Sequence, residues 1–181
     1  TMKNIAMLLF SIFTFQSVNA QQTCKTYITD EWPDSRYTVA DISGDRVVSD
    51  NKTGLMWKQC SEGLSGSDCS VGTLASLTWK EALDIADAED FAGFTDWRVP
   101  NIKELRTTVA RNCYSPSINV NVFPNTPNNW YWSSSPIADI DNYAWNVDFD
   151  GGYDSNDGRD DDFRVRLVRS LGPVFYSHLT L

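Results

Sequence analysis

The stretch DWRVPNIKEL, residues 96–105, joins an extended segment to the start of a helix. Asn101 and Glu104 have the spacing of a capping box, in which each side chain accepts a hydrogen bond from the backbone N–H of the other residue. Pro100 precedes this pair and separates an extended segment from the helix. We therefore predict a short second helix that begins after Asn101 and ends near Arg111.

Two elements are predicted upstream of this stretch. Thr78 and Glu81 form another capping-box pattern, and apolar residues follow at helical spacing, so a first helix is expected at residues 79–90. Two short apolar runs at residues 46–49 and 55–59 flank a turn that ends in Gly54. They predict a β-hairpin.

The composition changes downstream of Tyr114 to Pro, Asn, Ser, Asp, Gly and aromatic residues. Runs typical of strands occur at residues 130–134, 144–149 and 163–168. In the last run apolar residues alternate with arginines, which predicts a half-buried strand with its arginines on the outer face. The predicted fold class is α+β, with two helices and an irregular, mostly antiparallel sheet.

The N-terminus has the pattern of a secretory signal peptide. Lys3 precedes an apolar run of about 11 residues, shorter than the roughly 20 that a spanning helix needs, and small residues follow up to Ala20. Cleavage after Ala20 would leave a segment at residues 21–44, one domain at residues 45–170 and a tail at residues 171–181. We expect export to the periplasm, the medium or the cell surface, with no membrane insertion after cleavage.

The four cysteines, an even number in a chain with an export signal, favour two disulfides. Cys60 and Cys69 bracket a Gly- and Ser-rich loop and are expected to close it, which leaves Cys24 to tie the N-terminal segment to Cys113. Three pairings are possible in principle. Zinc is the rival interpretation, but the chain has no Cys-x-x-Cys pair and a single histidine.

Several phrases occur in the order found in one protein family. They are TGLMW (53–57), TW (78–79), DWRVP (96–100), KEL (103–105), FP (123–124), YWSSS (131–135) and VRLVR (165–169). Together they resemble the C-terminal domain of bacterial collagen-like adhesins, the Lcl C-terminal domain family. The resemblance covers about residues 45–170 and implies a C-type-lectin-like fold. We interpret the phrases as fold maintenance, with Asp96 and Arg98 suited to an ion pair beside an indole.

The segment at residues 133–164 has an unusual composition. It holds nine aspartates but no Lys, Glu, Gln or Met, whereas every Lys and Glu of the chain lies at or before Glu104. Diversity-generating retroelements copy the adenines of a template with errors, so that Asn codons change to Asp, Tyr, Ser, Gly, Ile, Phe, Arg or His but never to Lys, Glu, Gln or Met. The phrases at 132–136 and 165–169 resemble the borders of the variable repeat in target proteins of these elements.

We therefore predict a variable ligand-binding surface made of residues that such codons can reach. Its candidate positions are Ile137, Asp139, Asp141, Asn142, Tyr143, Asn146, Asp148, Asp150, Tyr153, Ser155, Asp157, Asp160, Asp161, Asp162, Phe163 and Arg164. The simpler alternative is an acidic surface loop that reflects a biased composition.

The run AWNVDFD at residues 144–150 indicates how such variation could spare the core. Strand alternation would turn Trp145, Val147 and Phe149 inward and Asn146, Asp148 and Asp150 outward. The physical analogy is an antibody paratope, in which tyrosines supply contact area on a rigid frame. Tyr143, Tyr153 and Phe163 would be the aromatic anchors.

Two rival functions follow from the same residues. Clustered carboxylates such as Asp154, Asp157 and Asp160 could hold calcium, but no Glu stands at the twelfth position of an EF-hand loop. Lectin-like oxygenases use a reactive cysteine pair, whereas the cysteines here are better used in disulfides, and His178 has no nearby nucleophile. We expect no cofactor, with calcium as the open possibility, and no enzyme activity.

An adhesin domain with a fixed protein or glycan ligand is the main alternative. Both interpretations place the site on the same surface, and fold alone does not choose between them. The formal net charge of −9 argues against nucleic acid and other polyanions as partners. The expected partner is a protein or glycan, at a cell surface.

Overall fold

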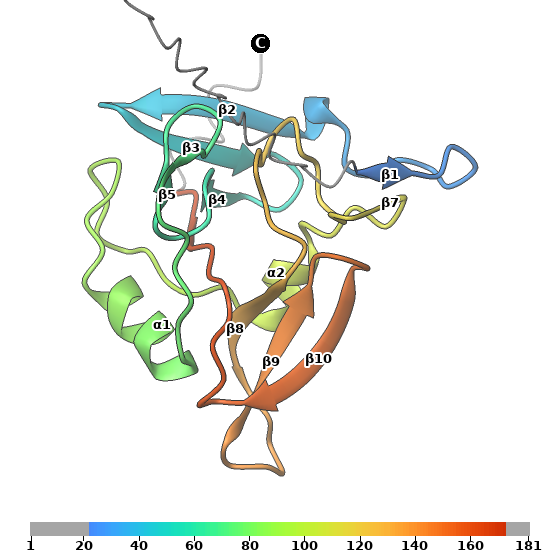
Figure 1. The fold of residues 1–181 in the computed structure, drawn as a ribbon. Helices are drawn as coiled ribbons and strands as arrows, with labels where there is room; N and C mark the ends of the chain where they lie inside the picture. The colour runs from blue at the N-terminus through green and yellow to red at the C-terminus, as the bar shows by residue number, and fades with distance from the viewer. Residues whose placement is uncertain (1–21, 173–181) are drawn as a thin grey trace, which may run out of the picture.

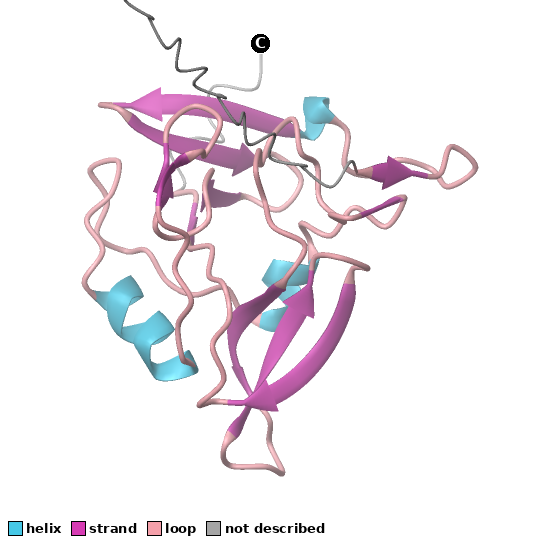
Figure 2. Cartoon of the chain, in the orientation of Figure 1, coloured by secondary structure: helices cyan, strands magenta, loops and turns pink. Residues whose placement is uncertain are grey.

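Antiparallel pairing arranges the chain into a four-stranded sheet, a three-stranded sheet and two short two-stranded sheets (Figure 1). The computed structural model describes residues 22–172. Helices α1 (Trp79–Asp87) and α2 (Ile102–Arg106) lie beside the sheets, and long loops connect the elements (Figure 2). This arrangement confirms the predicted α+β class.

The four-stranded sheet has the strand order β11-β4-β3-β2. Its strands are β2 (Tyr37–Ile42), β3 (Asp45–Asp50), β4 (Leu55–Lys58) and β11 (Val168–Ser170). The β3–β4 pair is the predicted hairpin, and Gly54 closes its turn at a φ of 71° by donating to the Asp50 carbonyl. Strand β2 was not predicted, although it pairs with β3 along its whole length.

The three-stranded sheet has the order β10-β9-β8, and its strands are β8 (Trp130–Pro136), β9 (Tyr143–Asp148) and β10 (Tyr153–Gly158). Strands β8 and β9 match predicted runs. Strand β10 was missed because its sequence, YDSNDG, has little intrinsic preference for strand. It forms because all six residues pair in register with β9.

Both predicted disulfides are confirmed. Cys24–Cys113 joins β1 (Thr23–Cys24) to β7 (Cys113–Tyr114), where the two cysteines face each other in the register. Cys60–Cys69 closes the loop that contains β5 (Leu64–Ser65), and β6 (Val71–Gly72), which pairs with β5, follows directly after this loop. The N-terminal segment, which includes the 3-10 turn Asp34–Arg36, is thus tied covalently to the rest of the domain.

Both capping boxes are present, but both helices end earlier than predicted. Helix α1 ends at Asp87 because Phe91 and Phe94 pair with each other across a tight turn. Helix α2 ends at Arg106 rather than near Arg111. The next residues cannot continue it, since Val109 bridges Ile118 and the Ala110 N–H donates to the Ser117 carbonyl.

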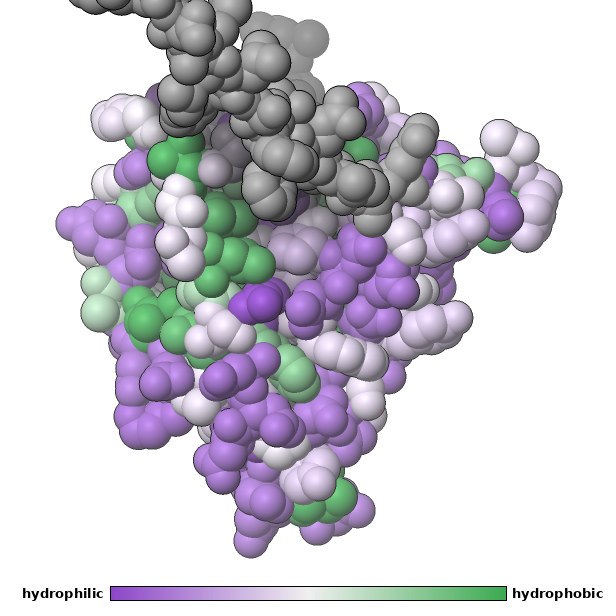
Figure 3. Space-filling model, viewed as in Figure 1, coloured by the Kyte–Doolittle hydropathy of each residue, from purple (hydrophilic) through white to green (hydrophobic). Residues whose placement is uncertain are grey.

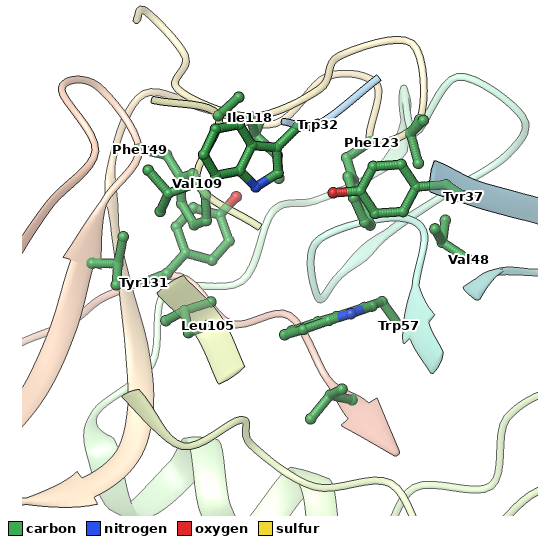
Figure 4. Close-up of a cluster of buried hydrophobic side chains, with 14 of the residues drawn as sticks. Trp32, Tyr37, Val48, Trp57, Leu105, Val109, Ile118, Phe123, Tyr131 and Phe149 are labelled. Carbon is green, nitrogen blue, oxygen red and sulfur yellow. The ribbon is translucent and has the colours of Figure 1, made fainter. Parts of the chain in front are cut away.

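The buried apolar side chains form two clusters. The first surrounds Trp57 and Tyr131, and the Tyr131 ring meets Phe149 edge-on at a centroid distance of 4.9 Å (Figure 4). The second packs Ala82 of α1 against Trp132 of β8. Strand β8 therefore contributes to both clusters and connects the two halves of the core.

The prediction of a half-buried strand at residues 163–168 is wrong. Residues 163 and 164 form single bridges, to Leu77 and Tyr131, and the regular strand begins only at Val168. The arginines do not face solvent, since Arg166 is 1% exposed and Arg169 is 8% exposed. The segment runs between the two sheets, so neighbours cover both of its faces.

Arg166 is held by hydrogen bonds instead of by a carboxylate. Its guanidinium donates to the carbonyls of Lys58 and Gln59 and to the hydroxyls of Ser61 (3.2 Å) and Thr126 (2.8 Å). Burial lowers the pKa of Arg166 below its ordinary value. These bonds tie the end of β4 to the segment that precedes β8.

The prediction of an ion pair between Asp96 and Arg98 is also wrong, because each residue bonds another partner. Asp96 accepts from the Nε of Arg169 at 2.6 Å, and Arg98 donates to Glu104 at 2.7 Å. Side chains two apart in an extended segment point in opposite directions, so they cannot easily meet.

A buried ion pair ties the N-terminal segment to the four-stranded sheet. Arg36 contacts Asp50 through two hydrogen bonds, and the Asp50 side chain is fully buried. Burial alone would raise the pKa of Asp50, but the bonds from Arg36 and from the Lys52 N–H outweigh it and lower the pKa.

The predicted signal peptide, residues 1–20, and residues 173–181 of the predicted tail lie outside the described residues. Among residues 22–172 no helix is long and apolar enough to cross a membrane.

Arg166→Ala is expected to lower the free energy of unfolding by about 3 kcal/mol or more, because several buried acceptors lose their donor at once. Urea unfolding followed by tryptophan fluorescence measures the change. Lys80→Ala is the control, since Lys80 forms an exposed pair with Asp84 and should change stability by less than about 0.5 kcal/mol. A loss below about 1 kcal/mol for Arg166→Ala would contradict the central role of this side chain.

Asp50→Asn is expected to cost about 3 kcal/mol at neutral pH, because it leaves Arg36 without its buried counter-ion. The folded pKa of Asp50 lies below the unfolded value, so the ionised carboxylate stabilises the fold above about pH 4, and this contribution is lost as the pH falls through the folded pKa. The stability difference between wild type and variant should therefore shrink on acidification. A difference that stays constant from pH 7 to pH 3 would argue against the pair.

Candidate functional site

Fourteen of the sixteen candidate positions occupy β9, β10 and the turns at the two ends of the three-stranded sheet, and the other two, Phe163 and Arg164, lie in the segment that follows. Fifteen of the sixteen are exposed or half-buried, and only Asn146 is buried. The structure therefore brings all of them except Phe163 and Arg164 to one sheet, but in three separate groups: a strip along β9 and β10, a lower end and an upper end.

The register defines the strip. Directly paired residues project from the same face of a sheet, and β9 pairs with β10 through Asp148↔Tyr153 and Asn146↔Ser155. Asp157, which pairs with Ala144, lies on the same face. We call Asp148, Tyr153, Ser155 and Asp157 the polar strip. Helix α2 packs on the opposite face of this sheet, where Asp154 of β10 bonds Arg106 at 3.2 Å.

Asn146 does not face solvent as predicted. It lies in the central strand opposite the fully buried Trp132, and its own exposure is 0%. Its Nδ2 donates to Asp157 at 2.9 Å, whereas its Oδ1 has no partner among the described residues. Trp145 lies on the same face of β9 as Val147, as predicted, but it is only half-buried, whereas Val147 and Phe149 are buried.

The lower end joins the β8–β9 connection, residues 137–142, to the turn after β10, residues 159–162. The backbone N–H of Arg159 donates to the Asn142 carbonyl at 2.7 Å, and its Nε donates to the Tyr143 carbonyl at 3.1 Å. Figure 3 shows this end as mostly hydrophilic, with a small hydrophobic patch at the tip. Its exposed aspartates are Asp139, Asp141, Asp160, Asp161 and Asp162.

The upper end is the β9–β10 turn, where two candidate residues also shape the backbone. Asp148 accepts from the Asp150 N–H at 2.9 Å, and Asp150 accepts from the Ser115 hydroxyl at 2.6 Å. Tyr153 is 69% exposed, and its ring lies so close to Gly151 that a Cβ there would fall 2.2 Å from it. Tyr153 is thus an exposed aromatic ring placed over a tight turn.

Phe163 and Arg164 do not join this open surface. The half-buried Phe163 ring packs against Trp132 at 4.6 Å between centroids. Arg164 donates to the Ala75 carbonyl at 3.1 Å, and its Nε is buried without a partner among the described residues. Of the three predicted aromatic anchors only Tyr153 is well exposed, since Tyr143 is half-buried too.

The aspartates of this region do not converge. Within residues 22–172 no three His, Cys, Asp or Glu side chains are grouped so that they could share a metal ion. Asp157 bonds Asn146, Asp154 bonds Arg106, and the lower-end aspartates spread over two turns. Calcium binding stays an untested prediction without a preformed group of ligands.

Residues 46–169 match the sequence profile of the Lcl C-terminal domain. The chain belongs to this family. The matched range contains the three-stranded sheet, all sixteen candidate positions and the Cys60–Cys69 disulfide, whereas β1 and β2 precede it. Strand β2, which precedes the matched range, is the edge strand of the sheet that it forms with β3, β4 and β11. The comparison with individual curated proteins gives no match.

Asn146→Tyr is expected to lower the free energy of unfolding by about 1–3 kcal/mol, because a large side chain cannot fit the buried site. Asp160→Tyr is the matched control on the exposed lower end and should change stability by less than about 0.5 kcal/mol. Chemical unfolding measures both. If the two variants were equally stable, the Asn146 side chain would be exposed, as the sequence predicted, and not buried.

Proposed function

We propose that this Lcl C-terminal domain is an exported, adhesin-type ligand-binding protein with a C-type-lectin-like scaffold. Its ligand would contact the polar strip and the two turns that continue it. We further propose that a retroelement diversifies the exposed positions of this surface, so that related chains bind different ligands.

The main observation behind the proposal is that nearly all the candidate positions, whose residue types fit mutated Asn codons, have exposed or half-buried side chains. The residues that error-prone copying of Asn codons can reach are exposed or half-buried at fifteen of sixteen positions. The residues interleaved with them on β9 include Ala144 and Val147, which are fully buried, and Phe149 follows at 1% exposure. Changing the candidate positions other than Asn146, Phe163 and Arg164 would therefore alter the surface without removing core contacts.

The geometry of the strip suits recognition of an uncharged or basic ligand. Tyr153 offers apolar contact area at a small entropy cost, and the neighbouring hydroxyl and carboxylates offer hydrogen-bond acceptors. The surrounding aspartates would repel anionic groups at this surface. A protein segment or a neutral glycan is therefore the expected ligand class.

Binding is favoured over catalysis by the state of the cysteines. All four are in disulfides, so no thiol is left for the reactive cysteine pair that lectin-like oxygenases use. The same disulfides support an oxidising location, as expected for an adhesin domain outside the cytosol.

A fixed-ligand adhesin is the second candidate, and the upper end favours it. Asp148 and Asp150 hold the β9–β10 turn through their carboxylates, and Asp150 also bonds Ser115. A position that must keep a specific hydrogen bond tolerates fewer residues than an exposed one.

Sequencing the coding DNA and its flanks tests the proposal. We expect a near-copy of the segment for residues 133–169 in which AAC or AAT codons stand at candidate positions, since one change of the first adenine to guanine converts Asn to Asp. The codons for Trp145, Val147 and Phe149 are the internal control and should be identical in both copies. If the flanks contain no such copy, the fixed-ligand adhesin replaces the diversified one.

A further inference from the structure

A pocket of about 350 Å³ lies between the N-terminal segment, the β3–β4 turn and α2. None of the residues that line it belongs to the sixteen candidate positions. It is built from residues 31–36, 52–53, 103–107 and 111, which are far apart in the sequence. Only the tertiary structure brings these segments together.

The lining of this pocket is strongly basic in a chain whose net charge is −9. One acidic side chain, Glu31, lines it together with five cationic ones: Arg36, Lys52, Lys103, Arg106 and Arg111. Like charges gathered in this way repel each other, so the cluster is unfavourable unless counter-charges reach it. The acidic side chains of the protein therefore decide which of these cationic groups remain without a counter-charge.

Two of the cationic groups are uncompensated. Arg36 is neutralised by Asp50, Arg106 contacts Asp154 at 3.2 Å, and Lys52 lies 3.7 Å from Glu31. Lys103 and Arg111, in contrast, form no ion pair and no side-chain hydrogen bond with any of the residues 22–172. Both side chains are exposed and remain available to an anion from solution.

The wall behind these groups is fixed in place. The Trp32 indole is 7% exposed and donates to the Thr107 carbonyl at 2.8 Å, and Arg36 donates to the same carbonyl at 3.1 Å. Thr107 directly follows α2, which carries Lys103 and Arg106 one turn apart on the same side. The N-terminal segment thus forms one wall of the pocket and α2 forms the other.

We propose that this pocket binds a compact anion that carries a carboxylate, phosphate or sulfate group. Lys103 and Arg111 would contact the anion directly, since an ammonium and a guanidinium are the groups that proteins use for such oxyanions. The adjoining hollow shares Glu31, Arg36 and Lys52 with the pocket and adds the acidic Asp30, so this hollow gives an extended polyanion no additional cationic contact.

The proposal is independent of the diversified ligand surface. Arg111 also lines a neighbouring hollow with Lys25, Tyr114 and Tyr153, so the pocket adjoins the upper end of the polar strip. The two sites nevertheless use different contact residues. Substitutions at Lys103 and Arg111 therefore test the pocket without changing any candidate position.

The test is a titration of the ¹⁵N-labelled protein, residues 21–181, with inorganic phosphate and then with sodium acetate at constant ionic strength. The seven tryptophans give seven indole N–H signals, and Trp32 reports on the pocket. We expect a saturable shift of the Trp32 signal, and Lys103→Gln and Arg111→Gln should each weaken binding by about tenfold, the typical loss of one charge-assisted hydrogen bond.

Lys80→Gln is the matched control, because it removes the same charge from an exposed lysine of α1 that does not line the pocket. It should leave the affinity unchanged. Weakening by Lys80→Gln equal to that of Arg111→Gln would show general charge attraction and overturn the proposal. The absence of a saturable Trp32 shift with either anion would overturn it too. Saturation by phosphate alone would restrict the ligand to phosphate or sulfate groups.

Discussion

The burial of the Arg166 guanidinium is the constraint on which the rest of the structure depends. A charged group with 1% exposure is costly unless its donors have partners. The two terminal nitrogens of Arg166 donate to two carbonyls and two hydroxyls, whereas its Nε has no partner among the described residues. The partners come from the end of β4, from the loop before β8 and from Ser61, whose hydroxyl also bonds Tyr131. One side chain thereby fixes the two sheets relative to each other.

Two further arginines extend this frame toward the edges of the domain. Arg169 bonds Asp96 ahead of α2, and Arg36 bonds the buried Asp50 at the end of β3. Each of these pairs joins segments more than ten residues apart, and the Cys24–Cys113 disulfide adds a covalent link on the N-terminal side. The α2 region lies between these links. They hold α2 in the position in which it packs on the three-stranded sheet and lines the basic pocket.

Because this frame is rigid, surface residues can be substituted with little loss of folding stability. The polar strip projects from the face of the three-stranded sheet opposite to α2, while Val147 and Phe149 pack into the first core cluster. The proposed ligand surface and the proposed anion pocket meet near Arg111 and Tyr153. The ligand surface would vary between related chains, whereas the anion pocket is built from residues outside the variable segment.

Local sequence signals were enough to predict several elements of the fold. The capping boxes at Thr78 and Asn101, the β3–β4 hairpin, the Cys60–Cys69 disulfide and the exposure of most candidate positions followed from residue types and spacing. The Cys24–Cys113 disulfide followed by elimination, since only these two cysteines were left. Tertiary structure alone decided the rest. Strand β10 exists because β9 offers it a paired edge, Asn146 is buried because its strand is central, and Arg166 is buried because its segment runs between two sheets. The basic pocket likewise joins residues 31–36 to residues 103–111, and no local pattern records which distant segments will become neighbours.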